Sequence, residues 1–240
     1  MVSAVFFSVF GQLLRPFSLQ VRYCFIHYWA RFCVWWLKLT CGISYRVQGQ
    51  DNLDLSQTGL LLARHESTWE TMAFQKIFPR QTYVLKKELL RIPFFGWGLA
   101  MLNPISIDRN AGRQAIKQVV NEGLERLQKG VWVIIFPEGT RMASGTPGKI
   151  KPGGALLAQK AKVPVYLVAH NAGRFWPKSG FIKTPGVVDI YISPPLDVEN
   201  MTVAEINQKT EEWFSAHLDT GSPMALEAEA KTEGGAEAMK

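Results

Sequence analysis

An apolar run that leads directly into a cluster of polar residues constrains the fold of this chain more than any other feature. Residues 59–63 have the length and composition of a buried strand. Residues 64–70 (RHESTWE) then carry an arginine, a histidine and two glutamates into residues 71–74, which have helical character. A strand that ends in a polar turn before a helix delivers side chains to the rim of a sheet. We therefore expect His65 to be accessible to a substrate.

The spacing of His65 and Glu70 restricts how the two side chains can meet. Five residues apart on a continuous helix, they would point about 140° away from each other. They can meet only if His65 precedes the helix and Glu70 lies in its first turn. Glu70 would then hold one imidazole nitrogen and stabilise the imidazolium, which leaves the other nitrogen for a substrate hydroxyl. The alternative is a structural histidine that closes a strand and bonds to the backbone.

Several other chemistries lack the residues they need. A His-Glu-x-x-His zinc site would require a second histidine where Trp69 stands. The chain has no Gly-x-Ser-x-Gly motif, and its cysteines all lie in the apolar N-terminal region, at Cys24, Cys33 and Cys41. An acyl-enzyme route therefore has no evident nucleophile.

A second strand end carries a similar polar cluster. Residues 131–136 read as a buried strand that stops at Pro137, and the sequence Glu-Gly-Thr-Arg follows at 138–141. Gly139 would let the backbone approach a ligand closely, and Arg141 offers a guanidinium to a phosphate. An ordinary turn built on Pro and Gly is the alternative interpretation.

In this order, the two clusters resemble the glycerolipid acyltransferase family, specifically the 1-acylglycerol-3-phosphate acyltransferases. In that family a His-x4-Asp motif precedes a Phe-Pro-Glu-Gly-Thr-Arg motif, and the second motif is present letter for letter at residues 136–141. The first motif departs from the family pattern because Glu70 stands where the commonest form has aspartate. Glutamate keeps the charge and adds one methylene, so we expect the pairing with His65 to survive with altered geometry.

Two further stretches are similar to blocks of the same family. Residues 86–97 and 105–109 resemble its second block, whose phosphate-binding arginine falls on Arg109. Residues 163–170 resemble its apolar fourth block. The resemblance runs from about residue 58 to about residue 195. His170 lies in the fourth block, and we expect its role to be structural.

The resemblance implies a reaction and a set of site residues. An acyl group would pass from acyl-CoA or acyl carrier protein to the free hydroxyl of lysophosphatidate, giving phosphatidate for phospholipid biosynthesis. His65 would be the base and Glu70 its orienting partner, and no metal or cofactor is implied. The substrate-binding residues would be Arg109, Glu138, Gly139, Thr140 and Arg141. Lys151 could add to an anion site, although a solvated lysine is the alternative.

Two alternative functions are transfer to another lysolipid, such as a lyso-aminolipid or lysophospholipid, and a non-catalytic lipid-binding protein of membrane surfaces.

The distribution of charge indicates the kind of partner. The chain of 240 residues has a formal charge of +7, but residues 219–240 carry −3, so the remainder carries +10. A basic surface suits anionic lipids or nucleic acid. No nucleic-acid motif accompanies it, and the apolar N-terminus favours a membrane surface. Three cysteines and no evident cleavable signal favour a reduced catalytic domain that faces the cytoplasm, at the inner membrane in a bacterium.

Residues 1–43 are unusually rich in aromatic side chains, and we expect a helical hairpin that lies in one leaflet of a membrane. The apolar run before Arg15 is too short to span a bilayer. Over residues 19–39, a helix would place His27, Arg31 and Lys38 in one narrow basic stripe. A signal peptide at the N-terminus and a spanning helix over residues 17–37 are the alternatives.

Beyond residue 42, strands and helices alternate, which predicts an α/β fold with a mixed sheet flanked by helices. The expected strands are 59–64, 82–86, 104–107, 131–136, 164–169 and 187–192. Helices are expected over 113–129, after Lys151 and from Thr202 to about residue 218, where Thr202 and Glu205 have capping-box spacing. The predicted organisation is therefore a hairpin (1–43), an acyltransferase domain (44–218) and a disordered tail (219–240).

Overall fold

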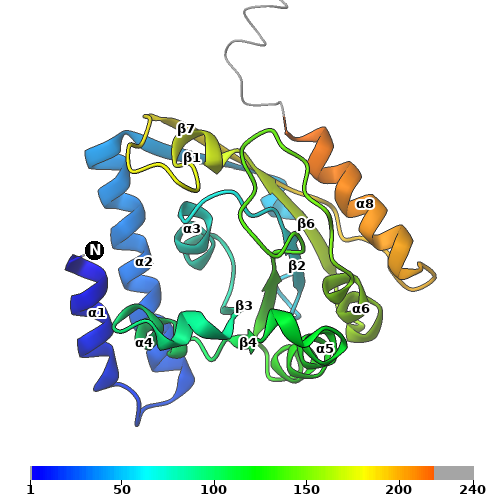
Figure 1. Cartoon of the computed structure of the whole chain (residues 1–240), viewed down its shortest axis with the longest axis horizontal. Helices are drawn as coiled ribbons and strands as arrows, with labels where there is room; N and C mark the ends of the chain where they lie inside the picture. The colour runs from blue at the N-terminus through cyan, green and yellow to red at the C-terminus, as the bar shows by residue number, and fades with distance from the viewer. Residues whose placement is uncertain (1, 219–240) are drawn as a thin grey trace, which may run out of the picture.

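Strand β2 (Leu60–Ala63) lies inside a seven-stranded sheet, and all four of its residues are buried. In the computed structural model, which describes residues 2–218, the strand order is β1-β7-β6-β2-β5-β3-β4 (Figure 1). The other strands are β1 (Ile43–Gln48), β3 (Gln81–Lys86), β4 (Ile105–Ile107), β5 (Trp132–Ile135), β6 (Val165–His170) and β7 (Gly186–Ile192).

Five strands, from β6 to β4, pair in parallel, and β7 joins β6 in antiparallel orientation while pairing in parallel with β1. The predicted mixed α/β sheet is therefore confirmed. The helices are α1 (Val2–Gln12), α2 (Leu19–Cys41), α3 (Trp69–Ile77), α4 (Phe95–Ala100), α5 (Arg113–Gln128), α6 (Pro152–Ala161), α7 (Ala172–Phe175) and α8 (Val203–Ala216).

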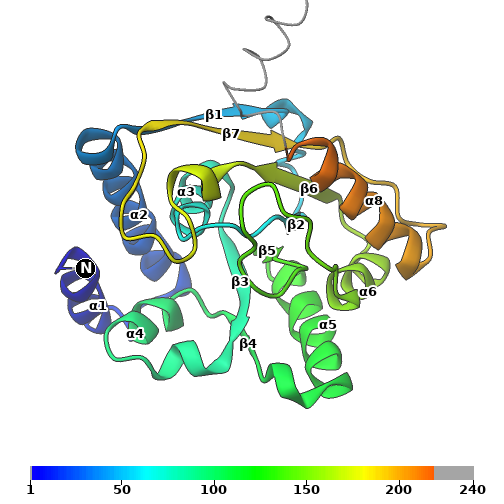
Figure 2. The same ribbon diagram turned by 45° about the horizontal axis from the view of Figure 1, so that its top comes forward.

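Alternate residues of the central strands face two different cores, as the period of two along a strand requires. Leu61 and Ala63 face an aromatic-rich core with helices α2 and α3, whereas Leu60 and Leu62 face an aliphatic core with α5, α6 and α8. The two groups of helices lie on opposite sides of the sheet (Figure 2). Burial on both faces explains why β2 and β5 are continuous apolar runs.

Most predicted elements are confirmed, including the capping box at the start of α8. Strand β1 is a correction to the prediction, because residues 43–48 were not expected to form a strand. Arg46 and Gln48 give it the polar character of a sheet edge, and its parallel pairing with β7 joins segments about 140 residues apart. Nothing local in the sequence indicates such a pairing.

Helix α2 has opposite faces of different character. Its buried face packs into the aromatic-rich core of the sheet, so α2 shares a core with the domain that follows it. The predicted boundary near residue 43 lies close to the end of this helix. Six large apolar side chains are exposed on the opposite face: Val21, Tyr28, Phe32, Trp35, Trp36 and Leu39. At about 100° per residue, these six fall within an arc of about 100°.

The predicted basic stripe on α2 needs one correction. Arg31 and Lys38 are exposed, but His27 is half-buried, with Nδ1 2.6 Å from the main-chain oxygen of Gln75 on α3. The packing of α2 on α3 therefore removes His27 from the stripe. Among residues 2–218, none of the helices combines the length and the apolar character needed to cross a membrane. The predicted tail lies outside the described residues.

Candidate active site

The pairing of β2 with β5 brings the two polar clusters together. These strands are parallel, with Leu62 opposite Ile135, so both end at the same edge of the sheet. His65 follows the end of β2, and residues 136–141 follow the end of β5. The Met142 N–H donates a hydrogen bond to the His65 carbonyl oxygen at 2.7 Å, which joins the two loops directly.

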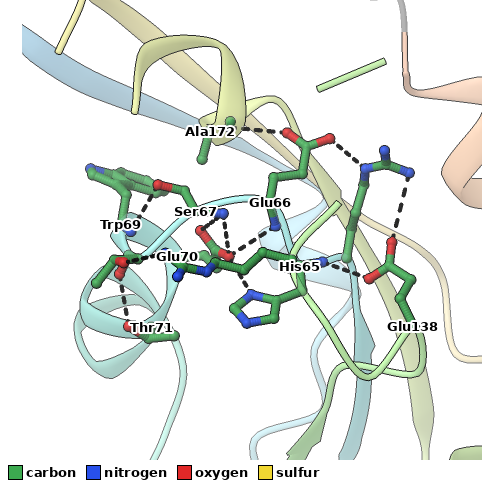
Figure 3. Close-up of polar contacts among 12 residues, drawn as sticks. His65, Glu66, Ser67, Trp69, Glu70, Thr71, Glu138 and Ala172 are labelled. Atoms are coloured by element: carbon green, nitrogen blue, oxygen red, sulfur yellow. Dashed lines mark hydrogen bonds and ion pairs between the residues drawn. The ribbon is translucent and has the colours of Figure 1, made fainter. Parts of the chain in front are cut away.

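His65 and Glu70 form the predicted pair. His65 precedes α3, Glu70 lies in the first turn of that helix, and the distance from His65 Nδ1 to Glu70 Oε1 is 2.7 Å (Figure 3). No residue in the described part of the chain bonds to His65 Nε2, and the ring lines a pocket. One nitrogen is therefore held by the protein, and the other is available to a substrate.

Glu70 is fixed by its own helix terminus. Its side chain is 0% exposed, and Oε1 accepts hydrogen bonds from the backbone N–H groups of Glu66 and Ser67 at 3.1 and 2.8 Å. Burial alone would raise the pKa of Glu70, but the hydrogen bonds from His65 and from the Ser67 N–H oppose burial, and the pKa is lowered. Glu70 is therefore ionised at neutral pH, which suits a group that stabilises an imidazolium.

Phe136 and Glu138 hold His65 from the second loop. The Phe136 ring stacks on the imidazole with centroids 4.1 Å apart. Glu138 Oε2 accepts a hydrogen bond from the His65 backbone N–H at 2.8 Å. Both contacts act on His65 itself, so the second motif contributes to the placement of the base.

The buried position of Glu138 differs from its predicted role as a substrate-binding residue, because its side chain does not line the pocket. Its side chain is 0% exposed and lies behind His65, 3.9 Å from Nη1 of the buried Arg64. Burial raises the pKa of Glu138 to about 8, and the His65 N–H and the Arg64 charge oppose that rise only in part. Glu138 therefore acts on the reaction indirectly, by holding the backbone of His65.

A buried polar network supports the turn that carries His65. The Arg64 guanidinium donates to Glu66 Oε1 and to the Thr146 carbonyl oxygen, and Glu66 Oε2 accepts from the Gly173 N–H. The Arg64 backbone carbonyl accepts from His170 Nε2 at 2.9 Å. Because the Ala172 N–H donates to the other nitrogen of His170, that ring is held as the neutral Nε2–H tautomer. His170 is structural, as expected.

The pocket at His65 is large and mainly apolar. Its volume is about 490 Å³, and it extends from the site to the helices of the N-terminal region. The walls near those helices include Phe7, Ile26, Trp29, Leu99 and Leu102. A long apolar cavity that opens beside a base can hold a hydrocarbon chain with its reactive end at the imidazole.

Two cationic side chains line the pocket, and a third contacts one of its lining residues. Arg109, in the turn after β4, and Lys151, before α6, line it together with His65. Arg141 donates from Nη1 to the Thr68 hydroxyl at 3.1 Å, and Thr68 also lines the pocket. Gly139 has φ +72°, and a Cβ there would lie 2.6 Å from Lys151 Nζ. The positive φ favours glycine, whereas the exposed Lys151 side chain can move away from an added Cβ.

The structure brings the predicted site residues to one edge of the sheet, with Thr140 exposed beside them. The prediction did not include Thr68, Phe136 or the Arg64 network among the site residues. For Lys151 it allowed either a place in an anion site or a solvated side chain. Lys151 had a signal in the sequence, because it precedes a helix N-terminus. The stacking of Phe136 and the network of Arg64 depend on the pairing of strands and had no local signal.

Comparison with known proteins agrees with this architecture. An acyltransferase family model matches residues 44–171. The chain is 42% identical to the 1-acyl-sn-glycerol-3-phosphate acyltransferase of Pseudomonas aeruginosa, over 90% of this chain and 85% of the relative. It is 32% identical to the enzyme of the same name from Saccharomyces cerevisiae, over 77% of this chain and 62% of the relative.

The fold is also similar to a solved structure. The crystal structure of the 1-acyl-sn-glycerophosphate acyltransferase PlsC from Thermotoga maritima superposes with a TM-score of 0.70 and 25% identity, covering 89% of this chain and 86% of that one. The histidine–glutamate pair, the family match and the shared fold lead to one conclusion: this chain belongs to the acyltransferase family.

Proposed function

We propose that this enzyme transfers an acyl group from a thioester to the free hydroxyl of a 1-acylglycerol 3-phosphate and forms phosphatidate. The observation that carries the proposal is the His65–Glu70 pair, with the second imidazole nitrogen open to a mainly apolar pocket that Arg109 and Lys151 also line. An acyl chain suits the apolar walls, and a phosphate suits the cationic side chains. The names of the relatives support this choice of acceptor.

In the proposed mechanism, His65 Nε2 accepts the proton of the acceptor hydroxyl while the hydroxyl oxygen attacks the thioester carbonyl. A carbon–oxygen bond forms and the carbon–sulfur bond then breaks, so that the thiolate leaves and takes the proton from the imidazolium. Glu70 stabilises the imidazolium between these steps. Base catalysis of this kind contributes about 10²- to 10⁴-fold to the rate.

The acceptor phosphate would be held by Arg109 and Arg141, with Lys151 beside them. Arginine binds phosphate through two parallel N–H groups, whereas lysine acts as a point charge. Gly139 would let the loop backbone approach the acceptor, and Thr140 lies at the exposed rim. The donor is proposed to be acyl-CoA or acyl carrier protein, with its acyl chain in the apolar pocket.

The protein is also proposed to act at a membrane surface, with its catalytic domain on the cytoplasmic side. The exposed aromatic face of α2, with Arg31 and Lys38 beside it, supports a hairpin that lies in the interface of an anionic bilayer. Release of the intact protein from membranes by high salt alone would contradict this part of the proposal.

The test of the reaction is acyl transfer by membranes that contain the protein. Labelled acyl-CoA would be offered with lysophosphatidate and with a panel of other lysolipids, beside the His65→Ala variant. Labelled phosphatidate that is absent with the variant would support both the reaction and the base. Transfer only to another lysolipid would show that this lysolipid, and not lysophosphatidate, is the acceptor. If no acceptor is acylated from either acyl-CoA or acyl carrier protein, the proposed function is wrong.

A further inference from the structure

The loop between α7 and β7, residues 177–185, carries two adjacent apolar side chains in water. Phe181 is 94% exposed and Ile182 is 81% exposed, more than any other large apolar side chain of the described residues. Exposing two such side chains next to each other is unfavourable unless a partner covers them. The loop therefore needs a partner that accepts apolar side chains.

The base of the loop holds this tip away from the protein. The Gly180 N–H donates to the Pro177 carbonyl oxygen at 3.1 Å, which closes a tight turn just before Phe181. On the other side of the tip, Lys183 Nζ donates to the Phe181 carbonyl oxygen at 3.2 Å and lies 4.4 Å from the centre of the Trp176 ring. The loop thus projects its apolar tip from an anchored base.

The charge around the tip is of one sign. Residues 171–188 include three basic residues, Arg174, Lys178 and Lys183, and no acidic residue. Apolar side chains flanked by lysines match the interface of an anionic bilayer, where the apolar groups enter the acyl region and the ammonium groups stay with the headgroups. An acyl-chain interior and an anionic headgroup layer are thus complementary to both features of the loop.

The loop also connects the active site with the exposed face of α2. At its start, Lys178 Nζ donates to the Thr140 hydroxyl at 3.4 Å. At its end, the Gly186 N–H donates to the carbonyl oxygen of Gly42, the residue that caps α2. In Figures 1 and 2 the segment before β7 runs beside the end of α2 that leads into β1. The two ends of the loop therefore contact the rim of the active site and the end of α2.

We propose that residues 177–185 form a second membrane-inserting element, in which Phe181 and Ile182 enter the bilayer while Lys178 and Lys183 bind anionic headgroups. This proposal rests on the membrane docking of α2 proposed above and extends it to the rim of the active site. With both elements inserted, Thr140 and the loop that carries Arg141 face the headgroup layer. An acceptor lipid reaches His65 without leaving the membrane.

Depth-dependent quenching tests the insertion directly. Cys24, Cys33 and Cys41 are replaced by serine or alanine, and the chain is labelled with a fluorophore at Ile182→Cys. Matched labels are placed at Trp36→Cys on the exposed face of α2 and at the exposed Ala204→Cys on α8, which packs on the opposite face of the sheet. Vesicles of phosphatidylethanolamine and phosphatidylglycerol contain a lipid brominated in its acyl chains.

The expected result is strong quenching at positions 182 and 36 and none at position 204. Quenching at 36 but not at 182 overturns the loop proposal and leaves the docking of α2 intact. No quenching at either position overturns both. In the absence of vesicles, the fluorescence of the label at position 182 could change as the protein concentration rises. Such a change would identify a second copy of the chain as the partner of the loop, which also overturns the proposal.

A matched activity measurement separates this proposal from the proposed function. The variant with Phe181→Ser and Ile182→Ser should lose about tenfold in transfer to lysophosphatidate embedded in vesicles. Its transfer to a short-chain lysophosphatidate that is monomeric in water should match that of the unaltered chain. If the variant matches the unaltered chain on the vesicle-embedded acceptor as well as on the monomeric one, the insertion of the loop is contradicted. Absence of transfer by the unaltered chain contradicts the proposed function instead.

Discussion

The two loops that meet at the active site are held in place in different ways. In residues 64–70, the charged side chains of Arg64, Glu66 and Glu70 are buried and bonded to neighbouring backbone or side-chain groups. In residues 137–151, Arg141 is half-buried and makes one hydrogen bond within the described residues, and Lys151 is exposed. The first loop fixes a base, and the second presents cations that can adjust to a ligand.

This difference has a physical reason. Proton transfer requires the base within about 3 Å of the hydroxyl in the correct orientation, so small displacements are costly. Binding of a phosphate by flexible cations tolerates more movement, because the attraction changes gradually with distance. Substitutions in the first loop should therefore lower kcat, whereas substitutions of the cationic residues in the second loop should raise KM.

The largest effect is expected for His65→Ala. Without the imidazole, the acceptor hydroxyl loses its base, and kcat should fall by about 10²- to 10⁴-fold. Rates with labelled acyl-CoA and lysophosphatidate measure the loss, and urea unfolding serves as the control for folding. Activity within a few-fold of that of the unaltered enzyme would mean that His65 is not the base.

Variants at Glu70 should show an intermediate effect. Glu70→Gln keeps the length of the side chain but removes the charge that stabilises the imidazolium, so kcat should fall by about 10- to 100-fold with little change in KM. Glu70→Asp keeps the charge on a side chain that is one methylene shorter, so its contacts with His65 and the Ser67 N–H should lengthen. Its kcat should lie between those of the unaltered enzyme and Glu70→Gln, and the reverse order would contradict the role of the charge.

Arg141→Lys should affect binding rather than turnover. The substitution keeps the positive charge and removes the paired N–H groups, so the KM for lysophosphatidate should rise about tenfold while kcat changes little. Lys209→Arg on α8, far along the chain from the site and exposed, is the matched control that exchanges the same two residue types. An unchanged KM would remove Arg141 from phosphate binding.

The smallest effect on activity is expected for Glu138→Gln, which keeps an oxygen for the His65 N–H. The pKa of Glu138 is raised from 4.5 to about 8, so the folded state holds this proton more tightly than the unfolded state. The contribution of Glu138 to stability is therefore present in full below about pH 4.5, declines as the pH rises and is lost above about pH 8. Urea unfolding between pH 5 and pH 8 should show a smaller decline for the variant than for the unaltered chain.

Glu138→Ala provides the complementary measurement. This variant leaves the His65 N–H without its acceptor, so kcat should fall while Glu138→Gln stays close to the unaltered enzyme. Equal losses of kcat in both variants would indicate that the carboxyl group itself contacts the substrate. An equal decline of stability with pH in the unaltered chain and in Glu138→Gln would show that Glu138 does not carry the pH dependence.

Local patterns in the sequence determined the elements of the site. The apolar runs at 59–63 and 131–136 predicted two buried strands, and the spacing of His65 and Glu70 required the turn before α3 that the structure contains. Helical geometry acts over a few residues, so these features could be deduced without knowledge of the rest of the chain. The cap of α8 at Thr202 was predictable for the same reason.

Tertiary structure alone decided which of these elements are neighbours. The strand order puts β2 beside β5, and that pairing places Phe136 on the His65 ring and Glu138 behind it. Strand β1 and the contact of His27 with α3 likewise depend on segments distant in sequence. Burial and pairing across such distances follow from the packing of the whole chain, because the same side chain can face a core, a ligand or water depending on its neighbours.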